Sequence, residues 1–488
     1  MPGVPVAMMP GRAAAVPALL ALLILALLLW SGAVFAVPLL LFVIILVFVL
    51  RTSGLVSPWY PKLAAGCLVG PEIPAEPVLT CKPSALASYL LLHCPRFRGP
   101  SAPPWPWGSL ASLQTAAALL GPPCRGVRFA REYLQLRDGG LVALDWAVSQ
   151  RARRRRASTN STAPVLLCIP NSFGRVTRNL TQLCQLALAH GYHPVIFNRR
   201  CHNECPLSTI KLQPYGDPCD LREAVQYIHH RHQASRLFAV AESTGAGLLF
   251  SYLGECGSSS YMTAAACISP LLCPQAWFED GCPWFWEKIF LFYQKLTLSR
   301  YATVLGEAVS MDEVMGSRSL KELEETLFCT TRTSTSSWES YWEHNDPLRD
   351  VDEVAIPLLC ICSHDDPIRG SAEKTLPVEL FETNPHLFLL QTQHGGHCGF
   401  LADSLTGEGW SHHALLDFFK STLDFFLMEE KHKGLSRRKE GGLGVLSKSI
   451  AGIGLAPKST EETRVCRQDP ICTHNIHEIY KWQRSYTR

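Results

Sequence analysis

The segment 236–253 constrains the fold more strongly than any other part of the chain. It begins with a short apolar run that predicts a buried strand, passes through small residues around Ser243, and ends in an apolar sequence that predicts a buried helix. A strand that turns sharply into a helix, with a serine at the apex and small residues two positions before and after it, is the geometry that presents a nucleophilic serine. The alternative is an ordinary strand–helix junction in which Ser243 only caps the helix.

Strands and helices alternate on both sides of this segment. The sequence predicts helices at 179–190 and 220–230, and buried strands at 165–169, 194–197, 264–268, 358–362 and 386–390. Such alternation predicts the α/β class, with a mostly parallel central sheet and flanking helices. The segment 273–350 is expected to form a helical cap, because it is inserted between two predicted strands. Its aromatic residues either line an acyl-chain pocket or pack as the core of the cap.

Three polar residues follow predicted strands in the order Ser243, Asp366 and His397. One large class of serine hydrolases has its serine, acid and histidine in this order along the chain. The serine hydroxyl needs a base, a histidine titrates near neutral pH and can take that proton, and a carboxylate orients the histidine. Asp365 is the alternative acid. His397 is preferred over His394 because flanking glycines allow the loop to place the His397 ring over the serine.

Several short motifs together resemble the AB-hydrolase-4 (YheT-like) family of α/β-hydrolases. They are 138–140, 144–146, 197–200, the turn around Ser243, 365–367 and 395–400, and the resemblance covers roughly 127–428. It implies an α/β-hydrolase fold and a membrane-anchored esterase or phospholipase that acts on a lipid or a small ester. It also implies that Ser243 is the nucleophile, His397 the base and Asp366 the orienting acid.

The chain departs from that family at the oxyanion hole. The family's His-Gly-x-x-Gly is replaced by Pro-Asn-Ser-Phe-Gly at 170–174, and Ala241 stands where the family has a glycine before the serine. We expect the backbone N–H of Thr244 and one from the loop at Asn171 and Ser172 to form the oxyanion hole. Two hypotheses follow. The protein is an active serine ester hydrolase, or it is a weakly active hydrolase-fold scaffold that binds a lipid or a protein partner.

The N-terminal part predicts a membrane segment. Residues 13–50 carry no charge, and about 20 apolar residues are enough for a helix to span a bilayer. The block fits one long anchor, two short helices, or a signal peptide that ends at Ala36 and leaves a second apolar run. We expect a single-pass signal-anchor in the endomembrane system, with secretion after cleavage as the alternative.

The other boundaries follow from composition. Residues 1–12 precede the apolar block, and 51–125 form a proline-rich extension. The hydrolase domain is expected at 126–430, followed by a basic tail at 431–488 that we expect to be disordered and available to a protein partner. Asn160 and Asn179 begin glycosylation sequons, which are usable only in a lumenal region.

Charge and cysteine content bear on whether the protein binds nucleic acid or zinc. The formal net charge of +3 and the pI near 8.1 indicate no dedicated nucleic-acid surface. The 19 cysteines include two close pairs, Cys201 with Cys205 and Cys360 with Cys362, but neither has a second pair nearby. Buried or disulfide-bonded cysteines are therefore expected rather than a zinc site, and no cofactor is expected.

Overall fold

The computed structural model describes residues 76–99, 110–124, 126–148, 163–173, 176–332, 335–401 and 408–446. All of them belong to the compact unit Ile73–Arg488, which the contacts separate from Met1–Glu72. The predicted membrane segment at 13–50 and the sequon at Asn160 lie outside the described residues. Within the described part, no helix is both long and apolar enough to span a membrane.

A nine-stranded sheet forms the centre of the molecule, in the order β1-β9-β8-β7-β6-β4-β5-β3-β2. Strands β4 to β9 pair in parallel, whereas β1, β2 and β3 pair antiparallel with their neighbours. The predicted α/β class with a mostly parallel sheet is confirmed. The strands are β1 Val78–Thr80, β2 Arg128–Gln135, β3 Leu141–Val148, β4 Val165–Ile169, β5 His193–Asn198, β6 Leu237–Glu242, β7 Met262–Ile268, β8 Leu358–Ser363 and β9 Leu387–Thr392.

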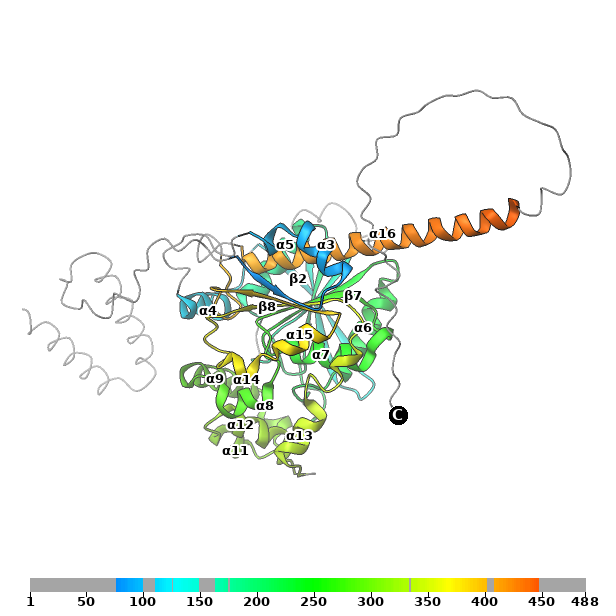
Figure 1. The fold of residues 1–488 in the computed structure, drawn as a ribbon. Coiled ribbons are helices and arrows are strands. Elements are labelled where there is room, and N and C mark those ends of the chain that lie inside the picture. The colour runs from blue at the N-terminus through cyan, green and yellow to red at the C-terminus, as the bar shows by residue number, and fades with distance from the viewer. Residues whose placement is uncertain are drawn as a thin grey trace, which may run out of the picture. The chain divides into compact units, whose positions relative to one another are not determined.

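Helices cover both faces of this sheet. Helices α3 (Ala85–His93), α5 (Arg178–Ala189) and α16 (Trp410–Leu446) lie on one face, and α6 (Cys219–Arg231), α7 (Gly245–Cys256) and α15 (Val378–Thr383) lie on the other (Figure 1). Along the central strands, alternate side chains belong to two separate apolar clusters, and each cluster packs against one layer of helices. This explains why the strands are apolar throughout, since both of their faces are buried.

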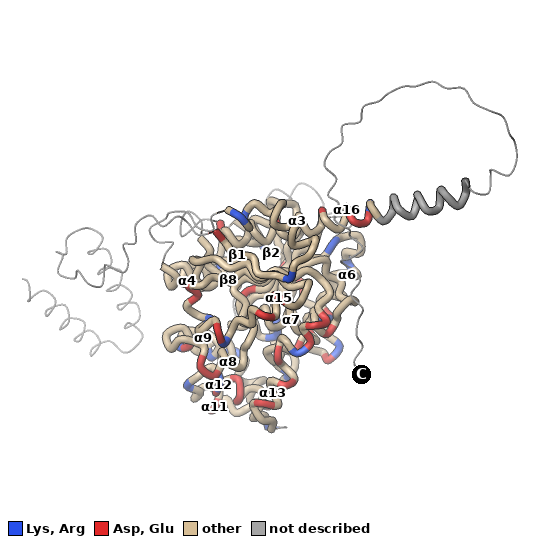
Figure 2. The backbone as a smooth tube through the Cα atoms, viewed as in Figure 1, with Lys and Arg blue, Asp and Glu red and all other residues tan. Residues whose placement is uncertain are grey.

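The insertion between β7 and β8 is helical, as expected. It lies beyond the sheet on the side of α7 (Figure 1). Charged residues are dense over this cap and over α6, and sparse along the central strands (Figure 2). The main cap elements are α8 Pro274–Ala276, η4 Trp277–Gly281, α9 Trp284–Ser299, α10 Ala302–Leu305, α11 Met311–Gly316, α12 Leu320–Glu324, η5 Glu325–Cys329 and α13 Trp338–Asn345.

The aromatic residues of the cap divide into two groups. Trp277, Trp286 and Phe290 are buried and pack in its core, whereas Trp284 and Phe285 at the start of α9 are 71% and 59% exposed. Core packing therefore accounts for only part of the aromatic run.

Two features differ from the sequence-based expectation, and a third decides between two expected alternatives. The extension before residue 126 contributes β1, which adds a strand to the sheet edge at β9, and also α4 (Ala111–Leu119). A strand of three residues is too short to give a periodic signal, so β1 could not be predicted. Helix α16 continues to Leu446, past the expected start of the tail at 431, although four glycines, which disfavour helix, lie between 431 and 446. The paired cysteines singled out above are buried free thiols, which is the first of the two alternatives expected for them.

Candidate active site

Ser243 occupies a strained turn between β6 and α7. Its φ angle is 54°, in the left-handed region that side chains rarely adopt. The chain can turn this tightly because the flanking residues are small. A Cβ on Gly245 would lie 2.5 Å from the carbonyl oxygen of Pro170, closer than any side chain can approach. The strand–turn–helix predicted around Ser243 is therefore present.

The loop after β9 places the ring of His397 over this serine. Its Nε2 lies 2.7 Å from Ser243 Oγ, and its Nδ1 lies 2.8 Å and 3.0 Å from the two carboxylate oxygens of Asp366. The ring of His397 is fully buried. The structure thus brings together the three residues predicted from their order along the chain, in the arrangement of a nucleophile, a base and an orienting acid.

Asp366, rather than Asp365, is the acid that faces the ring. The carboxylate of Asp365 instead accepts a hydrogen bond from the N–H of Gly396 at 2.9 Å and lies 3.3 Å from His394 Nδ1. Burial alone would raise the pKa of Asp366, but His397 outweighs it, with help from Arg369, and holds that pKa below its ordinary value. Asp366 is therefore ionised at neutral pH and can stabilise a charged imidazolium.

A helix of the N-terminal extension supports the histidine loop. The backbone N–H of His397 donates to Thr115 Oγ1 at 2.8 Å, and the same hydroxyl donates to the carbonyl of Ala111 at 2.8 Å. One turn of α4 also lies against Gly396, whose φ is 57° and where a Cβ would be 2.5 Å from the Ala111 oxygen. Sequence reasoning missed Thr115, because nothing in a single chain links this helix to a loop 282 positions later.

The predicted oxyanion donors, Thr244, Asn171 and Ser172, lie close together, but not all of their N–H groups are available to an oxyanion. The N–H of Ser172 donates to Thr244 Oγ1 at 2.8 Å, and the Ser172 hydroxyl donates to the same oxygen at 2.9 Å. The side chain of Asn171 accepts from the N–H of Phe173 at 3.0 Å. The Ser172 N–H, which we predicted to face an oxyanion, is thus directed to the Thr244 hydroxyl. Thr244 and Asn171 remain predicted donors through their backbones.

A buried polar network lies directly behind the nucleophile. Glu242 precedes Ser243, is fully buried, and accepts hydrogen bonds from Thr177 Oγ1 at 2.7 Å and from Asn179 Nδ2 at 2.9 Å. Burial raises the pKa of Glu242, although Asn179 and Thr177 oppose this effect. Asn179 is 2% exposed and also contacts His412 Nε2 at 2.7 Å, so the folded protein cannot be glycosylated there. The sequon at Asn179 is therefore buried in the folded protein, and glycosylation of the chain stays a prediction.

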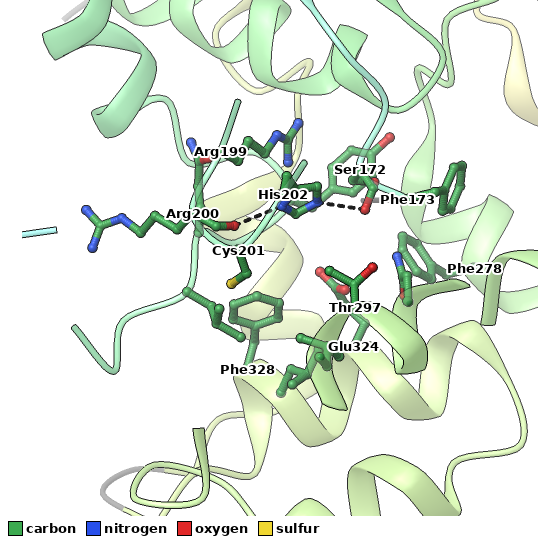
Figure 3. Close-up of a pocket in the computed structure, with 16 residues that line it drawn as sticks. Ser172, Phe173, Arg199, Arg200, Cys201, His202, Phe278, Thr297, Glu324 and Phe328 are labelled. Carbon is green, nitrogen blue, oxygen red and sulfur yellow. Dashed lines mark hydrogen bonds between the residues drawn. The ribbon is translucent and has the colours of Figure 1, made fainter. Parts of the chain in front are cut away.

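A cavity lies between Ser172, one of the predicted oxyanion donors, and the cap (Figure 3). His202 fixes one wall, since its two ring nitrogens lie 2.9 Å from the carbonyl oxygens of Arg200 and Ser172. Burial and the neighbouring Arg199 charge lower the pKa of His202. The lining residues are Ser172, Phe173, Arg199, Arg200, Cys201, His202, Leu212, Gln213, Tyr215, Phe278, Gln294, Thr297, Leu298, Glu324, Leu327 and Phe328.

The comparison with known proteins identifies relatives that extend over most of the chain. Protein ABHD15 of Homo sapiens is 51% identical over 417 residues, which cover 85% of this chain and 86% of that protein. Phospholipase ABHD3 of Mus musculus is 26% identical over 350 residues, 70% of this chain and 82% of that protein. Monoacylglycerol lipase ABHD2 of Danio rerio is 21% identical over 378 residues, 73% of this chain and 86% of that protein.

The comparisons with family models and with solved structures do not strengthen the family assignment. No model of a protein family matches the chain. An esterase structure from Pyrococcus furiosus covers 56% of this chain and 85% of its own, at 13% identity and a TM-score of 0.34, a similarity too low to carry an argument. The fold assignment rests on the sheet, the turn at Ser243 and the relatives described above. By its identity to human Protein ABHD15 over most of both chains, this protein belongs to the α/β-hydrolase domain-containing family.

Proposed function

We propose that the protein is a membrane-attached serine hydrolase that cleaves carboxylic esters of lipids through an acyl-enzyme intermediate. The observation that carries this proposal is the ring of His397, which lies 2.7 Å from the Ser243 hydroxyl and 2.8 Å from the Asp366 carboxylate. A serine at a strained turn, paired with a buried histidine and an ionised acid, is suited to nucleophilic attack on a carbonyl carbon.

The proposed reaction has two steps. Ser243 Oγ attacks the ester carbonyl while His397 Nε2 takes the hydroxyl proton, and the imidazolium donates through Nδ1 to Asp366. The tetrahedral intermediate collapses, and Nε2 returns the proton to the leaving alkoxide. Water then attacks the acyl-serine with the same base, releasing a fatty acid and regenerating the hydroxyl. The backbone N–H of Thr244, at the start of α7, is the proposed donor to the carbonyl oxygen in both steps.

Lipid esters are the proposed substrates for two reasons. The relatives at 26% and 21% identity are named a phospholipase and a monoacylglycerol lipase. The cavity beside the predicted oxyanion donors has apolar walls from both the cap and the hydrolase core, which suits an acyl chain. The uncharged block at 13–50 is proposed to hold the protein at a membrane of the endomembrane system, where such substrates are found.

A scaffold with little turnover is the second candidate, and two observations favour it. Ser243 is only 1% exposed, so no substrate reaches it without movement of the surrounding loops or the cap. The N–H of Ser172 is also occupied by the Thr244 hydroxyl. In this reading the hydrolase fold binds a lipid or a protein partner, and the basic C-terminal tail contributes to partner binding.

Fatty acid release separates the two candidates. The full chain, purified in detergent, would be incubated with a monoacylglycerol and with phosphatidylcholine, beside a Ser243→Ala variant with the same unfolding midpoint. The proposal predicts release by the wild type and none above background by the variant. Equal release by both proteins would refute the role of Ser243, and no release by folded wild type would favour the scaffold.

A further inference from the structure

Arg199 is a buried charge that forms no ion pair among the described residues. It follows β5, is 4% exposed, and none of the hydrogen bonds among the described residues uses its Nε or Nη2. The adjacent Arg200 shows the contrast, since its guanidinium donates to both carboxylate oxygens of Asp220 at 2.7 Å and also pairs with Asp138 at 2.8 Å. Leaving a buried charge unpaired is costly, so a residue in this state calls for a partner that is supplied from outside the chain.

The surroundings of Arg199 leave room for such a partner. Arg199 lines the cavity between the predicted oxyanion donors and the cap, together with apolar side chains such as Phe278 and Phe328 (Figure 3). Burial lowers the pKa of Arg199 from its ordinary value, with several anionic or polar neighbours opposing this only in part. The guanidinium therefore lies in a desolvated site where an anion would be attracted strongly.

Glu324 is the acidic residue that lines this cavity, and it forms no salt bridge with Arg199. Among the described residues, no carboxylate oxygen lies within salt-bridge distance of the Arg199 guanidinium. Glu324 instead accepts a hydrogen bond from the Tyr341 hydroxyl at 2.6 Å. Burial raises the pKa of Glu324 to about 7, opposed by Tyr341 and Arg199. Near neutral pH a large share of Glu324 is protonated, and the acid form can donate a hydrogen bond to an anionic oxygen.

We propose that this cavity binds the anionic group, a carboxylate or a phosphate, of an amphipathic ligand, with Arg199 as its charge partner. The planar guanidinium matches the spacing of carboxylate and phosphate oxygens, and the apolar walls accept the attached hydrocarbon. A neutral lipid would leave Arg199 unpaired and would bind more weakly.

This inference deepens the proposed function and rests on it for the role of the ligand. Ser172 lines the cavity and hydrogen-bonds to Thr244, the residue after Ser243, so the cavity adjoins the proposed catalytic site. An ester that carries its own anionic group, or the fatty acid product, fits both the cavity at Arg199 and the site at Ser243. The anion site itself can be measured without any hydrolysis.

The test is calorimetric binding to the full chain in the Ser243→Ala background, which cannot turn over an ester. The probes are decanoate, decyl phosphate and decanol, which share a chain length and differ only in the head group. We expect at least one anionic probe to bind about tenfold or more tightly than decanol. Because a charged hydrogen bond contributes about 1.5–3 kcal/mol, Arg199→Gln should weaken that anion about 10- to 100-fold and leave decanol unchanged.

Two further variants keep the test decisive. Glu324→Gln removes the negative charge while keeping a hydrogen-bond acceptor for Tyr341, so it should tighten anion binding above pH 7. A variant that merely damaged the fold would weaken every probe. Arg300→Gln, at an exposed position just after α9, is the matched control and should change nothing.

The outcomes are distinct from those of the hydrolase proposal. Tighter binding of decanoate alone assigns a carboxylate, and tighter binding of decyl phosphate alone assigns a phosphate. Equal affinity for decanol and both anions, or anion affinity unchanged by Arg199→Gln, overturns the inference. Because the binding measurement involves no hydrolysis, a failure here leaves the ester-hydrolase proposal standing, and absent hydrolysis in wild type leaves the anion site standing.

Discussion

Replacing Thr115 with valine tests whether the N-terminal extension holds His397 in place over Ser243. Valine keeps the shape of threonine but removes the hydroxyl, which accepts from the His397 N–H at 2.8 Å and donates to the Ala111 carbonyl at 2.8 Å. The His397 N–H and the Thr115 side chain are buried, whereas Ala111 is partly exposed. The variant therefore leaves the His397 N–H without its partner, which costs about 1–3 kcal/mol.

This energetic cost appears either in the free energy of unfolding or in the rate at which Ser243 is modified. If the loop keeps its position, the free energy of unfolding falls by the whole amount. If the loop moves to regain a partner, Nε2 of His397 leaves its 2.7 Å contact with Ser243 and the activation barrier rises instead. Since 1.4 kcal/mol corresponds to a factor of ten, the rate of Ser243 modification would then fall about 5- to 140-fold.

The assay combines the rate constant for labelling by a fluorophosphonate with the unfolding midpoint of the same preparation. Thr326→Val is the matched control, because Thr326 donates only to the carbonyl of Glu322 on an exposed part of the cap, at 2.7 Å. We expect a loss of stability or labelling for Thr115→Val and little change for the control. A Thr115→Val protein that labels and unfolds like wild type would refute the supporting role of α4.

Three further predictions follow from the same site. Asp366→Asn should lower the rate of ester hydrolysis about 10⁴-fold, since it favours the wrong imidazole tautomer, whereas Asp365→Asn should retain most of the activity; a reversed order would reassign the acid. Glu242→Gln should become more stable than wild type as the pH rises above 4.5, because burial raises the pKa of Glu242 and ionisation of its carboxyl then opposes folding. Unfolding midpoints of both proteins from pH 4 to 8 measure this effect. A difference in stability that does not change with pH would contradict it. Gly245→Ala should abolish labelling or prevent folding, because its Cβ would lie 2.5 Å from the Pro170 oxygen; a normally labelled variant would show that the turn can widen.

The sheet could be predicted from sequence because its strands are short, apolar and separated by turn and helix signals. Strands β4 to β9 each appear as an apolar run that both helical layers bury. The polar residues at their carboxyl ends converge for a geometric reason, since parallel strands end at the same edge of the sheet. Ser243, Asp366 and His397 could therefore be selected before any contact among them was known.

Contacts between distant segments could not be predicted in the same way. The contact of Thr115 with His397 joins parts of the chain 282 residues apart, and α4 carries no residue type that indicates a catalytic role. The hydrogen bond from Ser172 to Thr244 depends on the side-chain rotamer of a threonine, which no sequence pattern specifies. Arg199 is likewise indistinguishable from Arg200 until the positions of Asp220 and Asp138 are known.

Labelling by a fluorophosphonate tests the central claim most directly, because the reagent modifies only a serine that is activated by a working base and oxyanion hole. The measurement compares the full-length wild type with Ser243→Ala and His397→Ala at matched unfolding midpoints. The account predicts labelling of the wild type and none of either variant. Folded wild type that stays unlabelled, or a Ser243→Ala protein labelled as strongly as wild type, would contradict it.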